Sequence, residues 1–90
     1  MTDWDEISYV ISSTYRVETL SRLTEGPSTP SGIAEDTGQS IAHVSRALSD
    51  LENRGLVELL VSEHRQKGRV YGITDAGGAI WETIEAENLA

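Results

Sequence analysis

Small polar side chains and one long cation gather between residues 39 and 49. The set consists of Gln39, Ser40, Ala42, His43, Ser45, Arg46 and Ser49. Their hydroxyl, amide and imidazole groups can bond base edges or phosphates, and a guanidinium can fork onto a guanine. Bulk and negative charge would be excluded from a major groove, and no acidic residue lies from Thr37 to Ser49. The set therefore suits a helix that enters DNA, although an ordinary solvated helix face would also be polar.

A second cationic segment follows some twenty residues later. It contains His64, Arg65, Lys67 and Arg69, and no acidic residue lies from His64 to Thr74. Flexible cations at a hairpin tip suit contact with the DNA backbone or minor groove, because such contacts need no precise register. The alternative is a hairpin tip that charge keeps soluble.

The first set is predicted to lie on a helix that begins at Ser40 and ends before Gly55. Four apolar residues recur on one side of it, which we expect to pack on the core: Ile41, Val44, Leu48 and Leu51. A shorter helix is predicted to begin at Thr29-Pro30 and to end at Gly38. Two helices joined by so tight a turn form a helix-turn-helix.

After Gly55 the apolar pattern changes to that of strands. The runs Leu56–Val61 and Val70–Ile73 are short, β-branched and aromatic, which predicts a hairpin with a loop over residues 62–68. Further helices are predicted over residues 4–11, from residue 14 to about 24, and from residue 74 onward. The expected fold is an α+β winged helix-turn-helix, with the hairpin as the wing and a helix after it, forming one domain over residues 1–90.

The overall charge opposes a role in DNA binding. Fifteen acidic and seven basic residues give a net charge of −8 and a pI near 4.5, whereas DNA-binding domains are usually basic. Lys67 is the only lysine. An acid-rich, lysine-poor chain suits a protein from a salt-loving organism, although an ordinary acidic protein has the same balance. The acids are concentrated in residues 1–36 and 75–90, outside the two cationic windows.

Several function classes find no support in the residues. The chain has no cysteine, and its two histidines lack carboxylates at ligand spacing, so we expect neither a metal nor another cofactor. No nucleophile, phosphate-cradling loop or carboxylate pair suggests an enzyme. No apolar run could span a membrane and the first residues are acidic rather than basic, so we expect a cytoplasmic protein without membrane contact.

Two motifs resemble a known family. The segment from Leu48 to Val57 resembles the L-x-x-L-x-x-[RK]-G-L-[VI] passage of winged-helix regulators, and Tyr71 to Gly77 is similar to their Y-x-[LI]-T-x-x-G closing. Residues 30–34 resemble the start of their second helix. The family is the MarR/ArsR-like winged-helix group, in a short archaeal form that includes repressor-like proteins of halophiles and their viruses. The resemblance implies a dimer, with residues 39–49 in the major groove and residues 64–69 on the backbone.

The two end helices supply more apolar surface than a core of this size obviously needs. The residues concerned are Trp4, Ile7, Val10, Ile11, Ile80, Trp81 and Ile84. A homodimer interface would use them, since two-fold symmetry matches paired half-sites on DNA. Alternatively, they only close the core of the monomer.

The leading hypothesis is a homodimeric transcription regulator, most simply a repressor, that binds a specific site in double-stranded DNA. The alternative, from another class, is a winged helix used as a protein-interaction module in a transcription or replication assembly. There the acidic surface would face a basic partner.

Overall fold

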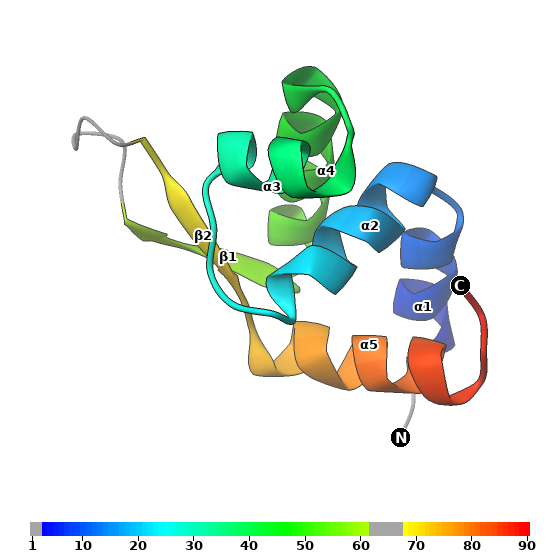
Figure 1. Cartoon of the computed structure of the whole chain (residues 1–90). Coiled ribbons are helices and arrows are strands. Elements are labelled where there is room, and N and C mark those ends of the chain that lie inside the picture. The colour runs from blue at the N-terminus through cyan, green and yellow to red at the C-terminus, as the bar shows by residue number, and fades with distance from the viewer. Residues whose placement is uncertain (1–2, 62–67) are drawn as a thin grey trace.

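The computed structural model describes residues 3–61 and 68–90, which form five helices and one antiparallel hairpin. The elements are α1 Trp4–Ile11, α2 Thr14–Leu23, α3 Pro30–Thr37, α4 Ile41–Asn53, β1 Val57–Val61, β2 Val70–Ile73 and α5 Asp75–Ala86 (Figure 1). The α+β winged helix-turn-helix expected from the sequence is confirmed, with α3 and α4 as its two helices. None of the described helices has the length and apolar character needed to cross a lipid bilayer.

Each helix begins at a side chain that accepts a hydrogen bond from a backbone N–H of the first turn. The capping residues are Asp3, Ser13, Thr29, Ser40 and Thr74. These bonds satisfy N–H groups that have no partner within the helix. Ser12 ends α1 and Ser13 caps α2, so the serine pair both breaks one helix and starts the next. At the end of α3, Gly38 has a φ of 76°, which glycine adopts without steric cost.

The core lies where α1, α2, α4 and α5 meet the base of the hairpin. Its members include Leu20, Leu23, Ile33, Val44, Leu48, Leu51, Leu56 and Val57. The end helices contribute Ile7, Val10, Ile80 and Ile84 to the same cluster, and Trp81 packs against it. Ile7, Val10 and Ile84 are at most 1 % exposed, so these side chains already lie in the core and have no surface left for a partner. Of the seven residues expected at a dimer interface, Trp4 and Ile11 keep the most exposed surface.

The hairpin is attached firmly at its base. β1 and β2 pair in register from Val57 opposite Ile73, and the other edge of β2 bonds Ser28 through Tyr71. A Cβ at Gly77 would collide with the carbonyl oxygen of Leu56, so only glycine allows α5 to approach the strand this closely. This contact gives a physical reason for the glycine that closes the Y-x-[LI]-T-x-x-G motif.

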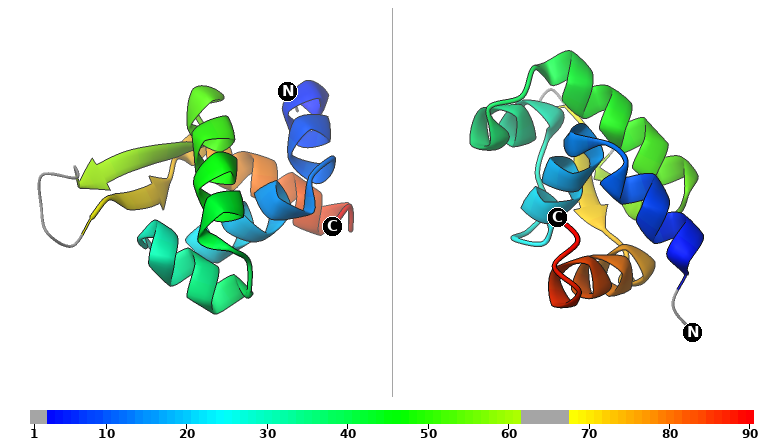
Figure 2. Two further views of the ribbon diagram at one scale, coloured as in Figure 1. Left: turned by 90° about the horizontal axis from the view of Figure 1, so that it is seen from above. Right: turned by 90° about the vertical axis from the view of Figure 1, so that its right-hand side faces the viewer.

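The wing extends from the helical body on the side of α3, while α5 runs from the base of the hairpin toward α1 (Figures 1 and 2). The base of the wing therefore lies beside the helix-turn-helix, whereas the two ends of the chain lie near α1 and α5.

Candidate nucleic-acid interface

A groove of about 380 Å³ lies between α4, the first turn of α3 and the start of β2 in the wing. We call it the recognition groove; its lining consists of Thr29, Pro30, Ser31, Ile41, Ser45, Leu48, Ser49, Gly68, Arg69 and Tyr71. It brings two of the sequence-predicted helix residues together with one predicted wing residue. None of the described residues that line it is acidic, although the chain holds fifteen acidic residues. The groove is therefore a surface that a polyanion can approach.

The outward face of α4 is presented because its opposite face is held in the core. Val44, Leu48 and Leu51 are buried. Ala42, His43, Ser45, Arg46 and Ser49, all predicted to contact DNA, are exposed. The helix thus presents small polar groups and one guanidinium to a ligand while its apolar side fixes its position.

Ile41 corrects one expectation. The sequence predicted that it packs on the core with the other apolar residues of α4, but it is 52 % exposed and lines the recognition groove. It is the first residue of the helix, so it projects beyond the edge of the core that Val44 closes one turn later. An exposed aliphatic side chain here can contact a thymine methyl group or a sugar.

Two of the predicted contacts are engaged within the turn that joins the helices. The hydroxyl of Ser40 accepts the N–H of His43 at 3.2 Å, as a helix cap. The amide nitrogen of Gln39 donates to the hydroxyl of Thr37 at 3.1 Å, and its Oε1 is buried without a hydrogen-bond partner among the described residues. Ser40 keeps its hydroxyl proton for a ligand, whereas the Gln39 amide is turned inward.

The exposed first turns of α4 also contact α2. The ring of His43 stacks on the ring of Tyr15 with a centroid distance of 4.0 Å and an interplanar angle of 16°. A hollow of about 100 Å³ beside this pair is lined in part by Arg46 and Asp50. Tyr15 was not among the residues that the sequence singled out, because it lies 28 positions before His43 in a helix outside the helix-turn-helix, and only packing brings them together.

The ion pairs in the described part of the chain are formed by arginines other than Arg46. Arg16 pairs with Asp50 at 3.3 Å, Arg22 with Asp36 at 2.7 Å and Arg54 with Glu6 at 2.7 Å. Among the described residues, no carboxylate lies within 4.0 Å of the guanidinium of Arg46. The pairing of Asp50 with Arg16 also offsets the acidic charge nearest to the outward face of α4.

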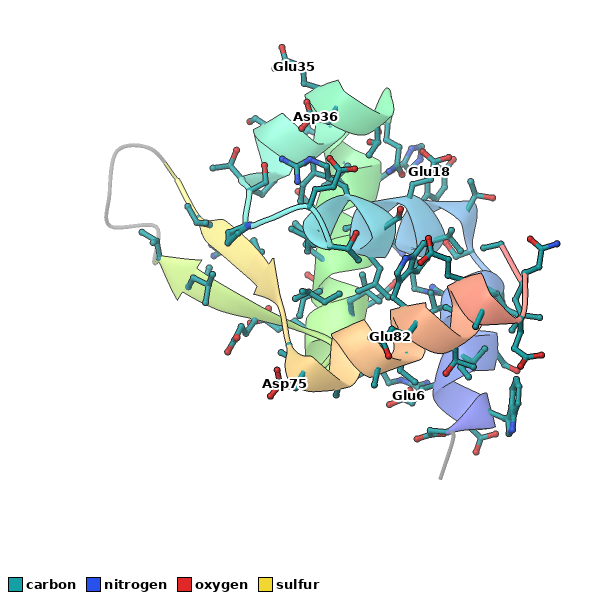
Figure 3. The ribbon with its side chains drawn as sticks, turned by 60° about the horizontal axis from the view of Figure 1, so that its bottom comes forward. Glu6, Glu18, Glu35, Asp36, Asp75 and Glu82 are labelled. Atoms are coloured by element: carbon teal, nitrogen blue, oxygen red, sulfur yellow. The ribbon has the colours of Figure 1, made fainter. Side chains whose placement is uncertain are left out.

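The carboxylates labelled in Figure 3 lie away from this face. Glu6, Glu18 and Glu82 lie along α1, α2 and α5, and Asp75 begins α5 at the base of the hairpin. Glu35 and Asp36 lie toward the end of α3, whereas the recognition groove is lined by its first turn. The acidic charge is thus carried mainly by other helices.

The wing contributes Arg69, which lies just before β2 at the loop end of the hairpin. Arg69 is exposed, and its guanidinium donates to the hydroxyl of the buried Tyr71 at 3.3 Å. This hydrogen bond directs the side chain of Arg69 along the strand. The other predicted wing contacts, His64, Arg65 and Lys67, lie outside the described residues. The predicted wing contact that the structure describes is therefore Arg69.

The family model "HVO_A0261 N-terminal domain" matches residues 4–88. The chain belongs to this family. No curated protein matches the chain significantly.

Solved structures resemble this HVO_A0261 N-terminal domain in fold. A MarR family transcription regulator has a TM-score of 0.78 and 18 % identity, over 94 % of this chain and 60 % of its own. A mutant of ZitR from Lactococcus lactis has a TM-score of 0.73 and 22 % identity, over 82 % and 51 %. A MarR family regulator from Neisseria meningitidis has a TM-score of 0.72 and 23 % identity, over 86 % and 55 %.

The fold of the HVO_A0261 N-terminal domain is thus the winged helix of MarR family transcription regulators, which confirms the resemblance found in the sequence motifs. The domain spans 51 % to 60 % of the lengths of these three proteins. Two of these three solved proteins are MarR family regulators.

Proposed function

We propose that the chain is a transcription regulator that binds a specific site in double-stranded DNA through α4 and the wing. The observation that carries the proposal is the recognition groove, whose described lining is free of acidic residues in a chain of net charge −8. A duplex carries one negative charge for every ~1.7 Å of its axis, so carboxylates on a surface that lies against its phosphates are repelled.

In the proposed complex, the first turns of α4 enter the major groove. Arg46 contacts a guanine edge or a phosphate, and His43 lies one turn before it on the same exposed face. Ser45 and Ser49 face the recognition groove and bond the backbone or a base, while Ile41 contacts a thymine methyl group or a sugar. The unpaired N–H groups at the start of α4 favour a phosphate there.

The wing then binds the DNA backbone or the minor groove beside the same site. Arg69 lies just before β2 on the recognition groove, and the sequence places His64, Arg65 and Lys67 in the loop that precedes it. Contacts of this kind hold the protein on the duplex without reading its sequence. They are expected to add affinity for every duplex alike.

We further propose that the regulator is a homodimer and acts as a repressor in the cytoplasm by occluding a promoter. The exposed apolar residues Trp4 and Ile11 support an interface at the α1 end of the molecule, away from the recognition groove. A dimer would place two copies of α4 on half-sites about one helical turn apart. Sedimentation at several protein concentrations tests this; a chain that stays monomeric at tens of micromolar would contradict the dimer.

The DNA proposal is tested by selecting bound duplexes from a random pool at low and at molar salt. We expect a consensus sequence, palindromic if the protein is a dimer, and an affinity that falls with salt because counterions are released. Arg65→Ala and Lys67→Ala should weaken all duplexes alike, while the consensus stays the same. Recovery of no consensus at either salt concentration would contradict sequence-specific binding.

A further inference from the structure

Tyr15 and His43 form an aromatic pair at the surface rather than in the core. Tyr15 is 42 % exposed in the first turn of α2, and His43 is exposed in the first turn of α4. Their rings are nearly parallel, with centroids 4.0 Å apart. Neither ring belongs to the cluster of buried residues that holds the helices together. The stack therefore calls for an explanation other than the closing of the core.

The stack fixes the orientation of a side chain that would otherwise rotate freely. An exposed histidine samples several rotamers, and holding it in one of them on binding costs conformational entropy. Contact with the face of Tyr15 restricts the imidazole before any ligand arrives, and the backbone N–H of His43 is fixed by the cap at Ser40. A group that is already oriented gains affinity because less freedom is lost on binding.

The surroundings of the stack suit contact with DNA. Tyr15 and His43 line the same small hollow as Arg46, the cation without a carboxylate partner in the described part of the chain. The acid at this hollow is Asp50, which Arg16 pairs at 3.3 Å. The edge of the imidazole is thus presented beside a guanidinium on the face that we assign to the major groove.

We propose that Tyr15 is a positioning residue for base recognition: it holds the imidazole of His43 in the orientation that reads one base pair. The proposal rests on the proposed function and extends the specificity-determining surface from the helix-turn-helix onto α2. Sequence preference at that base pair then depends on two residues from different helices that act as one unit.

The test measures binding of single-base-pair variants of the selected site by Tyr15→Ala, Tyr15→Phe, His43→Ala and the double variant Tyr15→Ala/His43→Ala. His43→Ala should lower the preference at one base pair by about tenfold, which is within the range for a single base contact. Tyr15→Ala should lower it at that same base pair and add nothing in the His43→Ala background. Tyr15→Phe keeps the ring and should behave as the wild type.

The outcomes separate this inference from the proposed function. A wild-type protein without sequence preference would overturn both. Three outcomes would overturn the positioning role alone. Tyr15→Ala could leave the wild-type preference unchanged, it could weaken binding to every duplex equally, or its effect could add to that of His43→Ala. Thermal unfolding of each variant identifies loss of folded protein, and Tyr15→Phe remains informative even if Tyr15→Ala is unstable, because rescue by a ring without a hydroxyl isolates the stack.

Discussion

Two grooves of this molecule use their charged residues in opposite ways. The recognition groove, between α4 and the wing, has no acid in its described lining. The other groove, of about 520 Å³, lies between α2, the end of α3 and α5, and we call it the acid-lined groove: Val17, Glu18, Ser21, Arg22, Glu25, Asp36, Thr37, Trp81 and Ala90. There the guanidinium of Arg22 is held by Asp36 at 2.7 Å and also donates to the carbonyl of Gly26. Arg46, near the recognition groove, has no such carboxylate among the described residues.

Under the proposed function, the difference implies that net charge is a poor guide to the partner of a small acidic domain. A duplex meets one surface, and exposed charges farther away than about 8–10 Å are largely screened at physiological salt. Arginines paired with carboxylates stabilise the fold, whereas an arginine without a carboxylate partner is available to a ligand. What decides the partner is therefore which cations remain unpaired and which surface lacks acids.

The largest expected effect comes from making the recognition groove resemble the acid-lined one. Ser45→Asp places a carboxylate in the recognition groove, where it repels phosphates and must lose its hydration in the complex. We expect DNA affinity to fall by about 100-fold or more, or roughly 2.7 kcal/mol, as measured by fluorescence anisotropy with the selected duplex.

Ser8→Asp is the matched control for Ser45→Asp. Ser8 is an exposed serine in the middle of α1, so the chemical change is the same, but the site is remote from the recognition groove. Because Ser8 shares a helix face with Trp4 and Ile11, sedimentation of this variant must show the oligomeric state of the wild type. The affinity of Ser8→Asp should stay within about twofold of the wild type, because screening weakens a distant charge. Equal losses in the two variants would mean that only total charge matters.

A smaller effect is expected from removing one guanidinium near the recognition groove or one in the acid-lined groove. Arg46→Ala should cost about 1–3 kcal/mol of binding and relax the preference for one base pair, as for a base-reading arginine. Arg22→Ala should leave DNA binding unchanged and lower the free energy of unfolding by about 1 kcal/mol or less, since Asp36 is half exposed. Titration of duplexes and urea denaturation measure the two quantities. The reverse pattern would show that the two arginines have been assigned to the wrong roles.

The smallest effect is expected at the border of α4, where Asp50 pairs with Arg16. Asp50→Asn removes a negative charge from the helix, while Arg16 keeps its hydrogen bonds to the carbonyl of Tyr9 and the hydroxyl of Ser12. We expect DNA affinity to rise by about threefold at low salt and the gain to shrink as salt increases. The free energy of unfolding should fall by about 1 kcal/mol or less. A loss of affinity would indicate that the ion pair itself positions α4.

Local signals predicted most of the fold. Thr29-Pro30, Ser40 and Thr74 each start a helix where their capping chemistry indicates, and the change from helical spacing to short apolar runs after Gly55 marks the wing. These features depend on residues a few positions apart, so a single sequence contains them. The exposed residues of α4 followed from the same periodicity.

What the sequence could not supply depends on packing between distant segments. The exposure of Ile41, the stack of Tyr15 on His43 and the pairing of Asp50 with Arg16 each arise because α2, α3 and α4 meet at particular angles. The end helices show the same limit. Their apolar residues fit a dimer interface or a core equally well in the sequence, and only the fold places Ile7, Val10 and Ile84 inside.

The contrast between the two grooves is tested most directly by mapping the DNA-bound surface on the isotope-labelled protein with NMR. The selected duplex should shift the backbone amide signals of the first turns of α4, the start of α3 and the part of the wing around Arg69. Signals from Glu18, Glu25 and Trp81 in the acid-lined groove should stay in place. Shifts concentrated in the acid-lined groove, with the signals of α4 unchanged, would contradict the account.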